Sequence, residues 1–218
     1  MIINSIFKSI AGEVNFFQQG RMNTFIRVQG CNLRCSYCDA PDAQRFGLSG
    51  GSKSVEEIME IVRTFKCKHV CITGGEPLLQ HGELSQLLIT LKKEHFKTYI
   101  ETNGSIDFNN VPIVMGTADC IVMDYKTSSS GCMEKMIFNN IDFLREKDFI
   151  KFVVADENDF HVGVNVMSTI KDRGLCSPSF AFSPVEGIMS GKELYNLMVK
   201  NNVDAVLNIQ LHKILGLE

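Results

Sequence analysis

The sequence predicts an α/β fold, a partial (β/α)6-type barrel with parallel strands. Short apolar segments alternate with amphipathic segments along the chain, which is the order of a parallel sheet with right-handed helical crossovers. Most apolar segments are continuously apolar, as strands buried on both faces are. Side chains able to bind ligands follow the ends of these segments, where a parallel barrel builds its binding site. An open doubly wound sheet has the same alternation, but the strand-end residues favour the barrel.

The expected strands are short, rich in Val, Ile and Phe, and bounded by polar residues or glycine. They are Asn23–Val28, His69–Thr73, Thr98–Thr102, Cys120–Asp124, Phe149–Val154, Ser179–Ser183 and Val206–Gln210.

The expected helices have apolar residues at helical spacing on one face. They are Val55–Phe65, Glu83–His95, Glu134–Glu146, Phe160–Arg173 and Lys192–Lys200. The first begins after Ser54 and has Glu57 three residues on, which predicts a capping box. Between the third and fourth strands, Pro112 and Gly116 leave little room for a long helix.

Length and composition limit the class of protein. The 218 residues suit one domain, and we expect a single domain over residues 1–218. The net charge of −3 gives no indication of a nucleic-acid-binding surface. No apolar run is long enough to span a bilayer, and the N-terminal segment lacks the pattern of a signal peptide. We therefore expect a cytoplasmic protein with no direct contact to membranes or nucleic acid.

Three of the eight cysteines, Cys31, Cys35 and Cys38, lie close together on a loop after a predicted strand. This C-x3-C-x2-C spacing lets three thiolates surround one compact metal centre. Iron–sulfur clusters usually have four cysteine ligands, so three ligands leave one iron open to a substrate or cofactor. A structural zinc site would need a fourth close ligand, which this segment lacks. The remaining cysteines are interpreted as small packing residues: Cys67, Cys71, Cys120, Cys132 and Cys176.

Polar residues follow the carboxyl ends of most of the predicted strands. Polar turns account for Asn103-Gly104 but poorly for Glu101, Lys126 or His212. The strand-end segments are Thr73-Gly74-Gly75-Glu76-Pro77, Glu101-Thr102-Asn103-Gly104, Asp124-Tyr125-Lys126, Ser183-Pro184 and Gln210-Leu211-His212-Lys213.

The cysteine spacing, with Tyr37 before the last cysteine, resembles the radical SAM (S-adenosylmethionine) superfamily, and Gly74-Gly75-Glu76 resembles its site for the methionine amino group. Over most of the chain, the sequence resembles the 7-carboxy-7-deazaguanine synthases of queuosine biosynthesis, in the form common in clostridia. Besides the strand-end segments beginning at Thr73, Glu101 and Gln210, the matching segments are Gly12-Glu13, residues 25–33, residues 150–154 and Asp159-Phe160.

The resemblance implies a radical SAM barrel with a 4Fe-4S cluster on the three cysteines. The implied reaction is the ring contraction of 6-carboxy-5,6,7,8-tetrahydropterin to 7-carboxy-7-deazaguanine, with loss of ammonia and with SAM as a regenerated cofactor. It also implies a flavodoxin- or ferredoxin-type electron donor and a homodimer.

The resemblance also implies which residues hold each ligand, although it assigns no catalytic residue. The guanidinium of Arg27 is suited to the substrate carboxylate, and the carboxylate of Glu101 to the guanidine-like edge of the pterin. The implied substrate residues are Ile10, Ala11, Gly12, Arg27, Thr73, Glu101 and His212. The implied SAM residues are Tyr37, Asp39, Gly74, Gly75, Glu76, Asp124, Tyr125 and Lys126.

Two positions depart from the family pattern. Val14 follows Gly12-Glu13 where a glycine is usual, and Ala40 follows Asp39 where many relatives have a threonine that binds magnesium. Because Ala40 has no side-chain oxygen, we expect magnesium to matter less here. Two other functions remain open from the sequence: a glycyl-radical activase acting on a partner protein, and a non-catalytic iron–sulfur or zinc protein.

Overall fold

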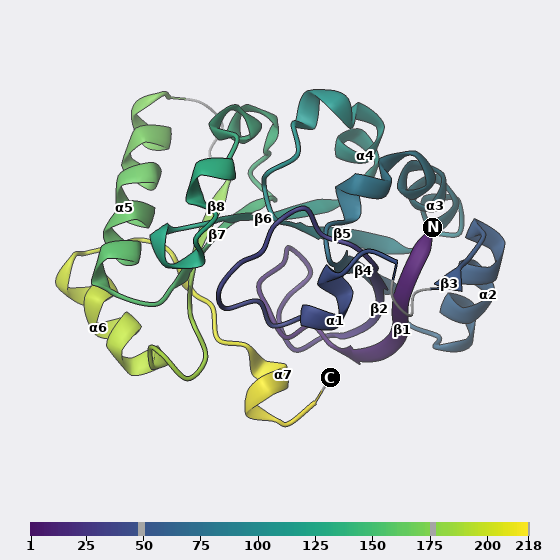
Figure 1. Ribbon diagram of the computed structural model, residues 1–218, viewed down its shortest axis with the longest axis horizontal. Coiled ribbons are helices and arrows are strands. Elements are labelled where there is room, and N and C mark those ends of the chain that lie inside the picture. Colours follow the sequence, from purple (N-terminus) through teal and green to yellow (C-terminus); the bar gives the residue numbers. More distant parts are fainter. Residues whose placement is uncertain (48–50, 175–177, 218) are drawn as a thin grey trace.

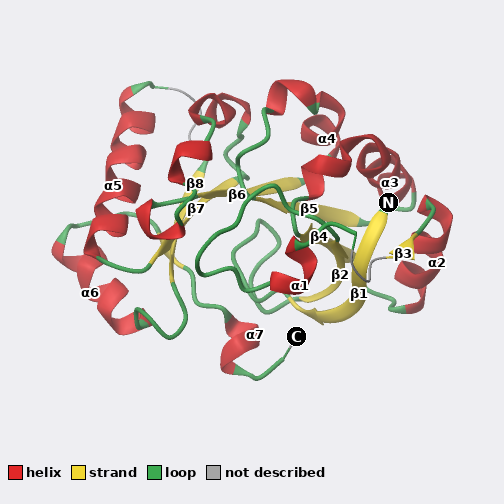
Figure 2. Ribbon diagram, viewed as in Figure 1, coloured by secondary structure: helices red, strands yellow, loops and turns green. Residues whose placement is uncertain are grey.

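The computed structural model describes residues 1–47, 51–174 and 178–217, and it contains one curved sheet with helices packed on its outer face (Figures 1 and 2). The strand order is β3-β1-β2-β4-β5-β6-β7-β8-β9. Neighbouring strands from β2 to β9 are parallel, whereas β1 is antiparallel to both β2 and β3. The sheet is not closed, because β3 and β9 are its two edges. The prediction of a partial barrel with parallel strands is confirmed. Cys176 lies outside the described residues.

The strands agree with the predicted apolar segments, most of them within one residue at each end. They are β1 Ile2–Ile10, β2 Met22–Val28, β3 Gly51–Ser52, β4 His69–Gly74, β5 Lys97–Thr102, β6 Cys120–Tyr125, β7 Phe149–Val154, β8 Ser179–Pro184 and β9 Val206–Leu207. The last predicted strand is shorter than expected. The sequence analysis did not predict β1, whose polar residues Asn4, Ser5 and Lys8 interrupt the apolar pattern.

The α-helices are α1 Pro41–Gln44, α2 Val55–Thr64, α3 His81–Lys93, α4 Pro112–Thr117, α5 Glu157–Asp172, α6 Gly191–Lys200 and α7 Leu211–Ile214. The 3-10 helices are η1 Pro77–Gln80, η2 Phe108–Asn110, η3 Ser128–Ser130, η4 Met133–Lys135 and η5 Phe138–Phe143. The predicted capping box of α2 is present, with Ser54 and Glu57 each accepting a hydrogen bond from the other's backbone N–H. No helix in the described ranges has both the length and the apolar character needed to cross a bilayer.

The predicted helix Glu134–Glu146 is wrong, since this crossover consists of the short 3-10 helices η4 and η5. The cause is Asn140, which is fully buried. Its side-chain amide donates to the carbonyls of Gly104 (3.0 Å) and Ile106 (2.8 Å), and its side-chain oxygen accepts from the backbone N–H of Phe108 (2.9 Å). These bonds fasten the crossover to the loop after β5, which favours short turns over a continuous helix.

Two apolar layers enclose the sheet. The larger core lies between the sheet and the outer helices, as between α3 and strand β5. A smaller cluster fills the concave side and includes Phe25, Cys71, Tyr99, Cys120, Val122, Phe149 and Ala181. Because successive residues of a strand face opposite sides, the residue two positions further along each strand faces the same interior. We call this smaller cluster the apolar plug. Strand alternation therefore determines which residues form the next layer above it.

Candidate active site

A pocket of about 710 Å³ lies at the carboxyl ends of the parallel strands. Six successive strands contribute one inward-facing residue each, and each of these residues lies two positions after a member of the apolar plug. The six residues are Arg27, Thr73, Glu101, Asp124, Lys151 and Ser183. Along each of these strands, the side chain facing the interior thus changes from apolar to polar or charged between one inward-facing residue and the next.

Most of the predicted site residues come together in this single pocket. Those that line it are Ile10, Gly12, Arg27, Cys31, Cys35, Tyr37, Cys38, Asp39, Thr73, Gly74, Gly75, Glu101, Asp124, Lys126 and His212. Ala11, Glu76 and Tyr125 do not line it. Ala11 is fully buried and exchanges backbone hydrogen bonds with Gly20 and Arg21. Tyr125 turns its ring toward Phe152, with the ring centres 5.9 Å apart.

The cysteine loop fits an iron–sulfur cluster. All three thiols line the pocket, and the sulfur of Cys31 accepts hydrogen bonds from the backbone N–H of Leu33 (3.4 Å) and the amide of Asn103 (3.5 Å). In the described part of the chain, no three acidic, His or Cys side chains are grouped closely enough for one metal ion.

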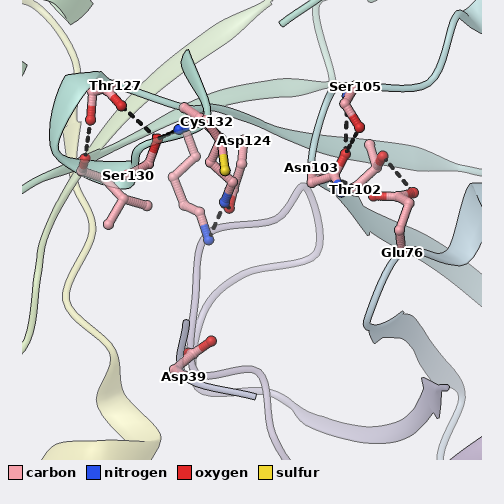
Figure 3. A network of polar contacts seen from close by, with 12 residues as sticks. Asp39, Glu76, Thr102, Asn103, Ser105, Asp124, Thr127, Ser130 and Cys132 are labelled. Atoms are coloured by element: carbon pink, nitrogen blue, oxygen red, sulfur yellow. Dashed lines mark hydrogen bonds and ion pairs between the residues drawn. The ribbon is translucent and has the colours of Figure 1, made fainter. Parts of the chain in front are cut away.

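A fourth cysteine, which was predicted to be a packing residue, also contacts the cysteine loop. Cys132 is buried beside Cys31 and Cys35. The backbone N–H of Ser36 donates to the carbonyl of Ser130 (3.1 Å), which joins the cysteine loop to the turn that carries Cys132. Figure 3 shows Cys132 on this turn, with Ser130 donating to Thr127.

The two glycines after β4 are required by a close approach of backbone to backbone. A Cβ on Gly74, whose φ is +122°, would lie 2.4 Å from the backbone of Val28, and a Cβ on Gly75 would lie 2.1 Å from the carbonyl oxygen of Gly30. The N–H of Gly75 donates to the carbonyl of Val28 at 3.0 Å. The absence of side chains here lets β4 pack against the start of the cysteine loop while both glycines line the pocket.

The structure places Glu76 differently from the expected cofactor-binding position. Its side chain is fully buried and accepts from Thr102 Oγ1 (2.8 Å), the N–H of Asn103 (2.7 Å) and the N–H of Leu78 (2.9 Å), as Figure 3 shows in part. Burial raises the pKa of Glu76 to about 7. Glu76 therefore braces the end of β5 and orients Asn103 toward Cys31.

Four charged groups form a chain across the floor of the pocket. Lys126 pairs with Asp124 at 2.6 Å, Lys151 pairs with Asp124 at 3.2 Å, and Lys151 also pairs with Glu13. Burial alone would raise the pKa of Asp124, but the two ammonium groups hold it below its ordinary value. Neither Glu13 nor Lys151 was among the predicted site residues, although both lie in sequence segments that match the family.

Glu101 lies beside this chain of charges. Burial and the neighbouring Glu13 raise the pKa of Glu101 to about 7, against the opposing effects of Lys151 and a hydrogen bond from Thr73. An ionised carboxylate accepts hydrogen bonds at both oxygens, whereas a protonated one donates from one oxygen and accepts only at the other, so a pKa near 7 lets Glu101 change between these states near neutrality.

The C-terminal segment closes the gap between the sheet edges on this side. Asn208 accepts a hydrogen bond from the N–H of Val14 (2.9 Å), and the N–H of Leu211 donates to the carbonyl of Gly12 (2.9 Å). These bonds bring the imidazole of His212 to the mouth of the pocket, and burial lowers its pKa. His212 is thus available as a neutral donor or acceptor at pH 7.

Comparisons with known proteins identify the family of the chain. The Radical SAM superfamily model matches residues 25–113. A 7-carboxy-7-deazaguanine synthase of Clostridium acetobutylicum is 35% identical over 211 residues, which cover 96% of this chain and 93% of that protein. A synthase of the same name from Methanospirillum hungatei is 35% identical over 217 residues, which cover 100% of this chain and 86% of that protein.

Two solved structures share the fold. QueE from Escherichia coli matches with a TM-score of 0.72 at 20% identity, over 96% of this chain and 93% of that one. SuiB from Streptococcus suis, bound to its precursor peptide SuiA, matches with a TM-score of 0.60 at 17% identity, over 84% of this chain and 47% of that one. The near-complete overlap with the synthases, and the cysteine loop that opens into one pocket with the charged strand ends, lead to one conclusion: this chain belongs to the 7-carboxy-7-deazaguanine synthase family of the radical SAM superfamily.

Proposed function

We propose that this protein catalyses the SAM-dependent ring contraction of 6-carboxy-5,6,7,8-tetrahydropterin to 7-carboxy-7-deazaguanine, with loss of ammonia. The observation that carries the proposal is one pocket that joins the three-cysteine loop to a wall of paired acidic and basic side chains. The likeness to synthases over nearly the whole chain supports the same reaction.

The cysteine side of the pocket suits the cluster and SAM. When bound on Cys31, Cys35 and Cys38, the reduced cluster would cleave SAM and supply the radical that removes hydrogen from the substrate. Asp39, Gly74, Gly75 and the Asp124–Lys126 pair line the same pocket and are the groups we assign to SAM. Glycine at positions 74 and 75 exposes backbone to a ligand there.

Other residues of the pocket lining suit the pterin. The planar guanidinium of Arg27 lies 5.1 Å from the centre of the Phe7 ring and faces the pocket, where its fork can bind the substrate carboxylate. Glu101 can accept from the amino and ring N–H groups of the pterin edge when it is ionised. The pocket backbone at Ile10 and Gly12, together with Thr73 and His212, completes the proposed substrate wall.

The remaining expectations rest on the same assignment. An electron must reach the cluster, and a flavodoxin- or ferredoxin-type donor is the class of protein that would supply it. We also propose a homodimer and a cytoplasmic location, with the described chain forming a single domain. Exposed apolar side chains at Ile214, Leu215 and Leu217 would suit contact with a second copy.

The test is anaerobic incubation of the reconstituted protein with SAM, a reductant and the carboxylated tetrahydropterin. The expected result is 7-carboxy-7-deazaguanine, identified by mass spectrometry, with little net consumption of SAM. A glycyl-radical activase without its partner protein, or an electron carrier, would form no 7-carboxy-7-deazaguanine. Absence of that product would refute the proposal.

A further inference from the structure

Lys151 is the buried cation of the pocket with no assigned role. It is the third residue of β7, 6% exposed, and its register partner on β6 is Asp124. Its ammonium pairs with Asp124 at 3.2 Å and with Glu13. A lysine is seldom buried this deeply unless its charge is balanced. The ammonium of Lys151 therefore depends on both carboxylates for its charge balance.

The two partners of Lys151 are not equivalent. Asp124 has a second ammonium, Lys126, at 2.6 Å. Glu13 has no other cation within ion-pairing distance in the described ranges, and its second oxygen accepts from the side-chain amide of Gln210 at 2.6 Å. Removing the charge of Lys151 would therefore leave Asp124 paired and Glu13 unpaired. The loss of this ion pair would therefore affect the N-terminal loop that carries Glu13.

Glu13 also lies close enough to Glu101 for the two charges to interact. Two carboxylates in one buried site repel, and Glu13 contributes to raising the pKa of Glu101 to about 7, whereas Lys151 lowers it. The other titratable or charged groups that act on Glu101 or line its pocket are Arg27, Cys31, Cys35, Tyr37, Cys38, Asp39, Cys71, Tyr99, Asp124, Lys126, Glu186, His212 and Lys213. Among the described residues, Lys151 is the cation that lowers the pKa of Glu101 most.

A reduced pterin is rich in hydrogen-bond donors, because it carries an amino group and several ring N–H groups. Ionised acceptors favour its binding, and a cation beside two neighbouring carboxylates helps both to stay ionised. Lys151 is such a cation, because it pairs with Glu13 and lowers the pKa of Glu101.

We propose that Lys151 is a positioning residue for the pterin: its ammonium holds Glu13 in the pocket wall and lets Glu13 and Glu101 be ionised side by side, so that both accept hydrogen bonds from the substrate. This inference rests on the proposed function, and it adds Glu13 and Lys151 to the substrate side of the site.

The experiment compares the reconstituted holoenzyme with Lys151→Met, Lys151→Arg, Glu13→Gln and the double variant Lys151→Met/Glu13→Gln. For each, kcat/KM for the pterin is measured from pH 5.5 to 9, and SAM affinity is measured by equilibrium dialysis. Lys97→Met, which removes an exposed lysine 4.0 Å from Asp119, is the matched control and should behave as the unaltered protein.

In Lys151→Met we expect kcat/KM for the pterin to fall about 100-fold at pH 7, because one carboxylate is left buried without a partner. The acid limb of the pH profile, where kcat/KM falls as the pH drops, should shift to higher pH by about one unit, since Glu101 is then harder to ionise beside Glu13. The double variant should return the limb to its original pH, and Lys151→Arg should keep it there. SAM affinity should change little, because Asp124 retains Lys126.

An unmoved acid limb in Lys151→Met, or a limb equally displaced in the double variant, would overturn the inference. Loss of iron and of SAM binding in both Lys151→Met and Lys151→Arg would also overturn it, as that result would mean a purely structural role. The failure of the proposed function is distinct from these outcomes, because the unaltered protein itself would then form no product from the pterin.

Discussion

The imidazole of His212 occupies the space that a side chain on residue 12 would need. A Cβ on Gly12 would lie 1.7 Å from Nδ1 of His212 and 2.6 Å from its Cγ. The two residues belong to opposite ends of the chain and are held together by the hydrogen bond from the N–H of Leu211 to the carbonyl of Gly12. Glycine at position 12 is thus what allows the C-terminal segment to close over the pocket.

Gly12→Ala should displace His212 and weaken the pterin site. Overpacking of this kind costs about 1–3 kcal/mol, so kcat/KM for the pterin should fall roughly 5- to 150-fold. His212→Ala should have a similar effect, and the double variant should be no worse than either single change, because both act through the same imidazole. Gly82→Ala, where a Cβ meets nothing within 4 Å, serves as the control. Additive losses in the double variant would contradict the contact.

Replacing Cys31, Cys35 or Cys38 by Ala should remove the cluster, because each thiol is one of only three expected ligands. Iron content, the visible absorption of the reconstituted protein and SAM cleavage should all be lost. Cys71→Ala should leave iron content unchanged, since Cys71 packs in the apolar plug below the pocket. A full iron complement in the Cys35→Ala protein would disprove the cluster assignment.

Arg27→Lys should weaken pterin binding more than SAM binding. A lysine offers one point charge where the substrate carboxylate accepts a two-pronged guanidinium, and the loss should be about 1.5–3 kcal/mol. It also loses stacking over Phe7, which lies 5.1 Å away. The measurement is the dissociation constant of each ligand by equilibrium dialysis. Equal losses for both ligands would contradict the role of Arg27.

Catalytic efficiency for the pterin should fall as the pH drops below about 7. Burial and Glu13 raise the pKa of Glu101 to about 7, so below that pH Glu101 binds a proton, loses its negative charge and presents a donor O–H where the pterin needs an acceptor. Activity therefore rises with pH through this range. In Glu101→Gln the acid limb should disappear and the remaining kcat/KM should be low at every pH. A pH profile for Glu101→Gln that keeps the same limb would assign it to another group.

Turnover should depend little on added magnesium. Ala40 lines the pocket next to Asp39 and offers no side-chain oxygen, whereas magnesium prefers near-octahedral oxygen ligands. Product formation is measured with chelator and across a magnesium titration, for the unaltered protein and for Ala40→Thr. Stimulation confined to Ala40→Thr would support the prediction. A large, saturable stimulation of the unaltered protein would show that Asp39, a backbone carbonyl or water replaces the missing hydroxyl.

The sequence by itself determined two features: the order of strands and helices in the parallel part of the sheet, and the cysteine loop that would bind the cluster. Strand and helix periods are local, so β7 Phe149–Val154 was predicted at its observed bounds. The cysteine spacing is equally local. Because carboxyl ends of parallel strands meet at one edge, residues as distant as Arg27 and Glu101 could be assigned to one pocket before the structure was known.

Only the tertiary structure decided which side chains at those ends face the pocket. Lys151 pairs with Glu13 across 138 residues of sequence, and it lies in the middle of β7, where an analysis of strand ends does not find it. Glu76 lies in the predicted segment but turns inward to Thr102 and Asn103. The physical reason is that register between strands sets the height at which each residue faces the interior, and register depends on packing along the whole sheet.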